Sequence, residues 1–235
     1  MGRIVVNILD RFKAPRAMTD LVVLKDSRNY IAEYDSEKYL LACKKYAKQY
    51  GVYLIPSRFA VNDYIYMCLF SPEGKILGIQ GATHLNLNLK SAFKQYDRLN
   101  IIDCPLGKIF LCVDTDIYHG EVLSAVREMG AELIVSSQFI SSYEYNDKML
   151  RLGVWNAAQS CHCFVLSVNN IEASLLAPCD LTRDLSGYSV MPTSEKNLAV
   201  KIFLGKLKKP TDLAHVGATK NRDFFKRHYK QLTSN

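Results

Sequence analysis

One stretch, residues 107–121, constrains the fold of this chain more than any other. From Ile109 to Val113 it is a short apolar run without helical spacing, which predicts a buried strand. The residues from about His119 to Met129, which begin in this stretch and continue beyond it, predict a helix. Asp114 therefore lies at a sharp turn between a strand and a helix. Such a turn exposes the side chain at its apex and directs backbone N–H groups toward it, so it is a usual place for a nucleophile.

Strand and helix patterns alternate along the rest of the chain. Predicted strands cover residues 4–8, 21–24, 52–55, 64–70, 75–79, 131–135, 163–168, 174–176 and 198–204, and further helices cover 35–50 and 146–160. The charged segment between the first two strands is broken by Pro15 and is too short for a useful helix, and residues 86–106 are predicted to be mostly loop. This alternation, in 235 residues of which 49% are apolar, predicts a single α/β domain.

Several segments resemble, in the same order, those of the nitrilase superfamily, the carbon–nitrogen hydrolases. The nucleophile segment of that family reads roughly G-K-I-x-x-x-x-C-x-D-x-x-x-P-E, and Gly107 to Glu121 falls in register with it without a gap. Asp20 to Asp26 resembles its D-L-V-V-x-P-E, and Gly81 to Leu85 its R-K-x-H-L. The resemblance implies a four-layer α-β-β-α sandwich over residues 1–205. A basic C-terminal tail with a short helix is expected over residues 206–235.

The chemistry of that family uses a glutamate as general base, a lysine that stabilises the tetrahedral intermediate and a cysteine nucleophile. The resemblance places these three roles on Asp26, Ala82 and Asp114. Asp26 is one methylene short, Ala82 has no cation, and Asp114 is a weaker nucleophile toward amides than a thiolate. We therefore expect a pseudoenzyme that keeps the hydrolase fold, retains a binding or assembly role and has room for a small amide-like ligand.

Two alternatives remain open. In the first, the chain is an active amide C–N hydrolase that uses Cys112 or a rearranged site. Cys112 is a candidate nucleophile because residues two apart on a strand face the same side, so it could point in the same direction as Asp114. A buried inert thiol is the simpler interpretation. If the chain is active, Lys75 or Lys90 could replace the missing lysine, although the simpler interpretation is that both are exposed. If Asp114 lies in a closed pocket, it needs a cation or donor beside it, or a pocket filled by side chains and water.

The second alternative follows from the net charge of +7, which is compatible with a basic anion-binding or nucleic-acid-binding protein. The sequence has no nucleic-acid recognition motif and no aromatic stacking series, so a nucleic-acid partner is not expected. Asp114, Asp116 and His119 form a D-x-D-x-x-H pattern that could hold a cation. A lone triplet is a weak pattern, and no metal or cofactor is predicted.

Cellular location and assembly are also predicted from the sequence. The seven cysteines are scattered and odd in number, which is typical of reduced thiols in the cytoplasm. No run of about 18 apolar residues is present, so no membrane span is predicted. The resemblance implies a homodimer, or a larger assembly, through the two helices that follow residue 114. An apolar face at Phe225, Tyr229 and Leu232 predicts that a helix in the tail contributes to it.

Overall fold

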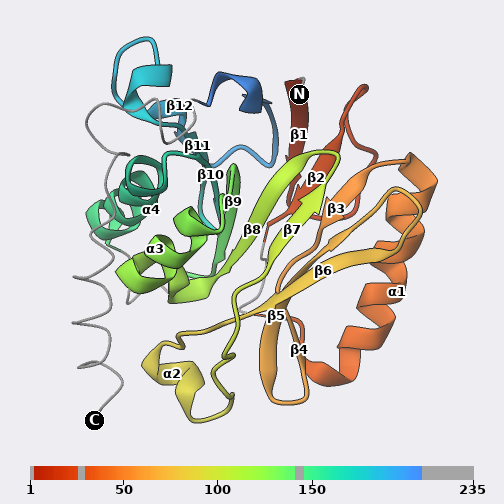
Figure 1. Ribbon diagram of the computed structural model, residues 1–235. Helices are drawn as coiled ribbons and strands as arrows, with labels where there is room; N and C mark the ends of the chain where they lie inside the picture. Colours follow the sequence, from red (N-terminus) through yellow and green to blue (C-terminus); the bar gives the residue numbers. More distant parts are fainter. Residues whose placement is uncertain (1–2, 26–29, 141–145, 208–235) are drawn as a thin grey trace.

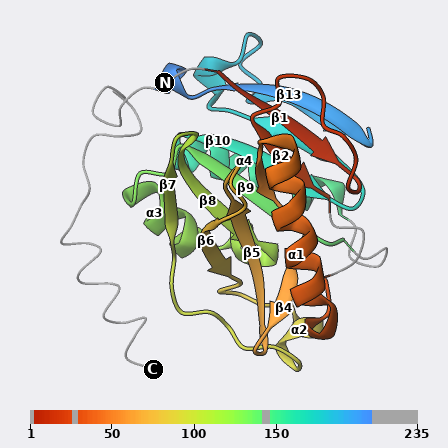
Figure 2. The ribbon, with the colours of Figure 1, turned by 90° about the vertical axis from the view of Figure 1, so that its right-hand side faces the viewer.

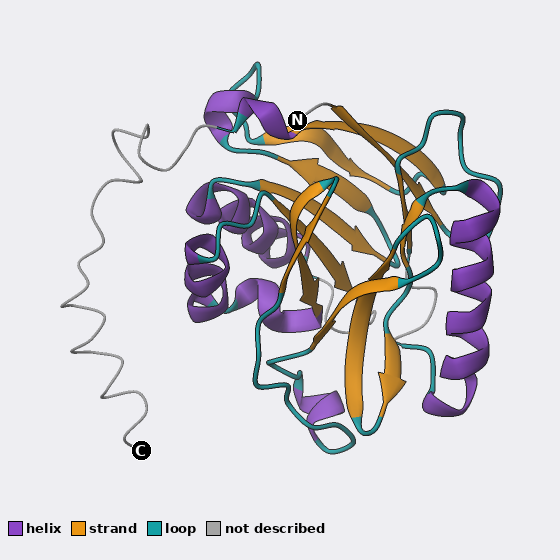
Figure 3. Cartoon of the chain, turned by 45° about the vertical axis from the view of Figure 1, so that its right-hand side comes forward, coloured by secondary structure: helices purple, strands orange, loops and turns teal. Residues whose placement is uncertain are grey.

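Two β-sheets pack face to face and helices cover their outer faces (Figure 1), in a computed structural model that describes residues 3–25, 30–140 and 146–207. The helices lie outside the two sheets, as Figure 3 shows by colour. The predicted four-layer α-β-β-α sandwich is therefore confirmed. Among the helices of the described residues, none combines the length and apolar character that a membrane crossing requires.

The first sheet holds the start and the end of the described chain. Its strand order is β13 (Asn197–Phe203), β1 (Arg3–Leu9), β2 (Leu21–Leu24), β3 (Tyr53–Ile55), β5 (Tyr64–Phe70) and β4 (Phe59–Val61), and β6 (Ile76–Gly81) also pairs with β5. Strands β1 and β13 run antiparallel side by side (Figure 2). Helix α1 (Glu33–Tyr50) covers the outer face and ends at Gly51, whose φ of 62° is left-handed as a helix-ending glycine requires.

The second sheet carries the turn that the sequence singles out. Its strand order is β12 (Tyr188–Thr193), β11 (Ala173–Leu176), β10 (Phe164–Asn169), β9 (Leu133–Gln138), β8 (Gly107–Val113) and β7 (Ile101–Cys104). Helices α3 (Gly120–Glu128) and α4 (Asp147–Cys161) cover its outer face. A short helix α2 (Leu87–Lys90) and a 3₁₀ turn over Asp114–Tyr118 lie between the main elements.

Three apolar cores fill the three spaces between the four layers. Alternation along β8 divides its side chains between two of them, because successive residues of a strand face opposite sides. Ile109, Leu111 and Val113 pack between the two sheets. Phe110 and Cys112 pack on the other face, against α3 and α4. The strand therefore directs the thiol of Cys112 toward the helical layer.

The loop between β1 and β2 covers part of the outer face of the first sheet. Residues 10–20 form no helix, as their length and charge predict. Instead, the ring of Phe12 packs against Tyr39 and Tyr46 of α1, and the Tyr46 hydroxyl donates a 2.6 Å hydrogen bond to the Lys13 carbonyl. Helix α1 and this loop together cover the outer face of the sheet.

Most predicted elements are present, and the differences are confined to short strands. Strands β4, β7 and β12 are missing from the sequence-based prediction, and residues 86–106 contain β7 and α2 instead of loop alone. Strand β7 has four residues, one of which is the exposed Asp103. Its apolar pattern is therefore too short to predict a strand without knowledge of its partner β8. The predicted helix of the C-terminal tail lies outside the described residues.

Candidate active site

The turn after β8 has the geometry that the sequence predicts. The strand ends at Val113, and the 3₁₀ turn that starts at Asp114 leads into α3. Asp114 has a φ of 52°, in the left-handed region that non-glycine residues seldom occupy. Such backbone positions persist only when the surrounding structure holds them, and they gather at functional sites. The position that the family uses for its nucleophile is therefore built as a sharp turn.

Asp114 is paired with a buried arginine from the opposite sheet. Nη1 of Arg58, a residue between β3 and β4, lies 2.9 Å from Oδ1 of Asp114. The Asn86 amide donates a longer hydrogen bond of 3.3 Å to Oδ2 of Asp114. The Arg58 side chain is 0% exposed and that of Asp114 is 4% exposed, so water screens their attraction little. The expectation that a carboxylate here needs a cation or a donor is confirmed.

Ala82 lies at the end of β6, close to the same turn in the fold. It is buried in the core between the sheets; its N–H donates to the Ile65 carbonyl and its own carbonyl accepts from the N–H of Tyr96. Its methyl group supplies no charge, as the sequence indicates. Asp26, the third position of the implied triad, lies outside the described residues.

Asp116 ties the loop after Ala82 to the turn after β8. Its carboxylate accepts hydrogen bonds from the N–H of Thr83, the hydroxyl of Thr83 and the N–H of His84, at 3.0, 2.7 and 2.7 Å. Thr115 adds a bond from its hydroxyl to the His84 carbonyl. Burial raises the pKa of Asp116, and the donors from Thr83 and His84 oppose that shift. This polar network thus joins the loop that follows Ala82 to the turn that contains Asp114.

Cys112 does not share the direction of Asp114. The expectation that both point to the same side is wrong, because the strand ends at Val113 and the left-handed turn redirects Asp114 toward Arg58. Cys112 is completely buried on the helical side of the sheet. Burial, reinforced by the nearby carboxylates, raises its pKa well above the ordinary value for a thiol. A thiol in such surroundings is protonated and inert at neutral pH.

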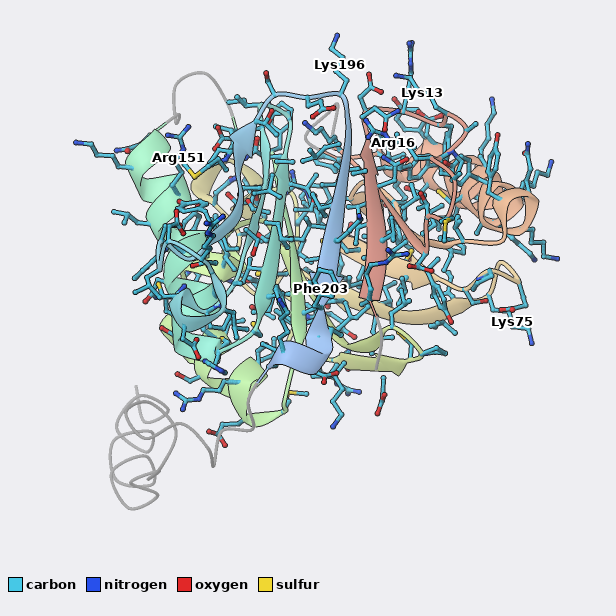
Figure 4. The ribbon with its side chains drawn as sticks, turned by 90° about the horizontal axis from the view of Figure 1, so that it is seen from above. Lys13, Arg16, Lys75, Arg151, Lys196 and Phe203 are labelled. Carbon is cyan, nitrogen blue, oxygen red and sulfur yellow. The ribbon has the colours of Figure 1, made fainter. Side chains whose placement is uncertain are left out.

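The two lysines considered as replacements lie away from this network. Lys75 is exposed in the turn between β5 and β6, and its side chain points outward from the body of the protein in Figure 4. Lys90 is exposed at the end of α2. The cation beside Asp114 comes instead from Arg58. The sequence around Arg58, Pro56-Ser-Arg-Phe59, carries no motif that would have indicated this role.

The three residues of the D-x-D-x-x-H pattern separate in the structure. Asp114 contacts Arg58, Asp116 contacts the loop at Thr83 and His84, and the ring of His119 stacks on that of His84 at a centroid distance of 3.5 Å. His84 and Glu121 also line an open surface groove of about 350 Å³. The pattern therefore does not form a metal site of its own.

Comparison with known proteins agrees with the fold. Residues 21–199 match the family model for carbon-nitrogen hydrolases, and this chain belongs to that family. The resemblance to the nitrilase superfamily is thereby confirmed. No curated protein matches the sequence significantly.

Solved structures share the fold at low sequence identity. A carbon-nitrogen hydrolase from Helicobacter pylori G27 superposes with a TM-score of 0.80 at 15% identity, over 100% of this chain and 99% of that one. Saccharomyces cerevisiae Nit3, a member of branch 10 of the nitrilase superfamily, gives 0.72 at 14% identity, over 94% and 97%. An amidase from Nesterenkonia sp. gives 0.72 at 11% identity, over 97% of both chains.

Proposed function

We propose that this chain is a catalytically impaired carbon–nitrogen hydrolase, a pseudoenzyme that retains the fold for binding or assembly. The observation that carries the proposal is the buried ion pair between Arg58 and Asp114 at the nucleophile turn. A carboxylate neutralised by a guanidinium group is a poor nucleophile, and the guanidinium that binds it is not available to an oxyanion. Ala82 supplies no second cation.

The surroundings of Cys112 argue against an active hydrolase that uses this thiol. Its complete burial gives a substrate no access, and its raised pKa keeps it protonated. Its side chain packs toward α3 and α4, whereas that of Asp114 pairs with Arg58 of the opposite sheet. The turn at Asp114 instead carries a buried ion pair with Arg58.

An assembly role is supported by the helical layer on the second sheet. Met129 at the end of α3 and Leu152 on α4 are 41% and 63% exposed, although both side chains are large and apolar. We propose that this layer contacts a second copy of the chain. The seven cysteines are free thiols, six of them buried, which supports a reducing compartment such as the cytoplasm.

The test is a turnover assay on the purified full-length chain with simple amides, carbamoyl amines and nitriles. An active amidase of the same fold serves as the positive control, and a Cys112→Ala variant serves as the matched control for the alternative nucleophile. We expect no hydrolysis above buffer from either form of this chain. Hydrolysis that the Cys112→Ala change abolishes would overturn the proposal and establish Cys112 as a nucleophile.

A further inference from the structure

A second cluster of polar side chains lies on the surface at the start of α3, apart from the Arg58–Asp114 pair. Nε2 of His84 lies 3.3 Å from Oε1 of Glu121, and Nδ1 of His119 lies 3.5 Å from the same oxygen. The three ligand atoms lie within 4.8 Å of one another. His84 comes from the loop between β6 and α2, which passes beneath α3 in Figure 1, whereas the other two residues begin that helix.

Hydrogen bonds fix the tautomer of His84. The single hydroxyl proton of Thr83 is donated to Oδ1 of Asp116 at 2.7 Å, so Nδ1 of His84, 3.0 Å from that hydroxyl oxygen and 3.2 Å from Oδ1, is the donor in both contacts. In the neutral ring Nε2 then carries a lone pair. Nε2 of the neutral His84 ring and the carboxylate oxygen of Glu121 are therefore two hydrogen-bond acceptors that face each other.

A cation between these two acceptors satisfies both. A proton on Nε2 of His84 supplies one, and a neutral His119 that carries its proton on Nδ1 then donates to the same oxygen. A single metal ion serves all three groups at once. An imidazole whose other nitrogen donates to a buried carboxylate is the usual arrangement of a histidine that ligates a metal.

We propose that His84, His119 and Glu121 bind a divalent transition-metal ion of the zinc class. Two imidazole nitrogens and a carboxylate are a ligand set that zinc accepts, with bonds of about 2.0–2.2 Å. Tetrahedral ligands at that bond length lie about 3.3–3.5 Å apart, and the His84–Glu121 and His119–Glu121 separations are 3.3 and 3.5 Å.

Three protein ligands leave a fourth position open. Two of the three ligands, His84 and Glu121, line the groove of about 350 Å³, whose walls also include Tyr96 and Arg98. Water or a small ligand in the groove would complete the coordination, as in zinc sites with three protein ligands. The site is separate from the Arg58–Asp114 pair, so the proposal does not depend on whether the chain hydrolyses amides.

The experiment measures zinc binding to the full-length chain after treatment with a chelator and desalting. Titration calorimetry compares the parent chain with His119→Ala and Glu121→Gln. Both residues are partly exposed, so both changes are expected to leave the fold intact. A His162→Asn variant is one control, because this histidine lies outside the cluster. A His215→Ala/His228→Ala variant is the other and tests the two histidines that the structure does not describe.

We expect one zinc ion per chain in the parent and both controls. In each cluster variant the affinity should fall by more than about 100-fold, since loss of even an outer partner of a metal ligand costs about 10–100-fold. A Co²⁺ complex should show ligand-field bands without thiolate-to-cobalt charge transfer. Unchanged zinc affinity in both cluster variants, no binding by the parent, or a thiolate band would each overturn the proposal.

Discussion

Nη1 of Arg58 lies 2.9 Å from Oδ1 of Asp114, and this ion pair connects the two sheets of the sandwich. Arg58 lies between β3 and β4 of the first sheet, and Asp114 follows β8 of the second. Removing two charges from water costs several kcal/mol for each ion, and their mutual attraction offsets this only while both are present. The contribution of each residue to the stability of the fold therefore depends on the presence of the other.

Replacing Arg58 alone should destabilise the fold strongly. We expect Arg58→Met to lower the free energy of unfolding by about 3–5 kcal/mol, because it leaves the buried carboxylate of Asp114 without its cation. The double variant Arg58→Met/Asp114→Asn should recover part of that loss, since asparagine is neutral and tolerates a left-handed φ. Urea denaturation of the two single variants and the double variant measures the coupling. Strict additivity of the two changes would contradict this account.

Restoring the family's catalytic residues should require removal of Arg58. We expect the triple variant Asp26→Glu/Ala82→Lys/Asp114→Cys to remain inert, because the guanidinium still fills the space beside the nucleophile position. Adding Arg58→Ala should give measurable esterase or amidase activity. Active-site labelling with an amide electrophile such as fluoroacetamide, followed by mass spectrometry, identifies the reacting thiol. Equal activity with and without Arg58 would show that this residue does not block the site.

Asp116 should be needed as a carboxylate, even though burial raises its pKa. Asp116→Asn places an amide nitrogen among the donors of Thr83 and His84 and leaves at least one of them unsatisfied. We expect a loss of about 1–3 kcal/mol in the free energy of unfolding for each donor that loses its acceptor. Asp97→Asn, at an exposed position, is the matched control and should change stability by less than about 0.5 kcal/mol. Equal melting temperatures for the two variants would refute this role.

Stability should decline at alkaline pH because of two buried groups of α1. Burial raises the pKa of the Cys43 thiol and of the Tyr46 phenol, each to about 12, from 9.0 and 10.0. In that interval the folded chain holds protons that the unfolded chain releases. Stability is therefore complete below pH 9 and falls as the pH rises toward 12. Urea midpoints at several pH values measure the decline, and Tyr46→Phe should make it shallower. A midpoint that rises over this range would contradict the assignment.

The oligomeric state tests the proposed assembly role. We expect light scattering to show a dimer or a larger species for the full chain. A version that ends at Gly217, without the apolar face at Phe225, Tyr229 and Leu232, should have a smaller mass or a lower melting temperature. Leu152→Glu on α4 should favour the monomer, and Tyr34→Glu on the opposite helical layer is the matched exposed control. A monomeric full-length chain would exclude the assembly.

Local sequence patterns predicted most of the fold. The apolar run from Ile109 to Val113 is short and lacks helical spacing, which indicates a buried strand, and Gly51 ends a helix because it adopts a left-handed φ at little cost. Strands β4 and β7 were missed because each is short, and β12 was missed because none of its side chains is fully buried; all three are defined by their partners in the sheet. Their pairing is set by contacts that are distant in the sequence.

The features of the candidate site also divide into those that the sequence predicts and those that only the structure reveals. By itself the sequence determined that Asp114 occupies the sharp turn after β8 and that Ala82 offers no cation, because local pattern and side-chain chemistry decide both. Only the tertiary structure decided that Arg58 is the partner of Asp114, that Cys112 faces the helices and that His84 meets His119 and Glu121. The physical reason is that sheet packing brings residues from separate strands and loops within a few ångströms, and no spacing along the chain records that distance.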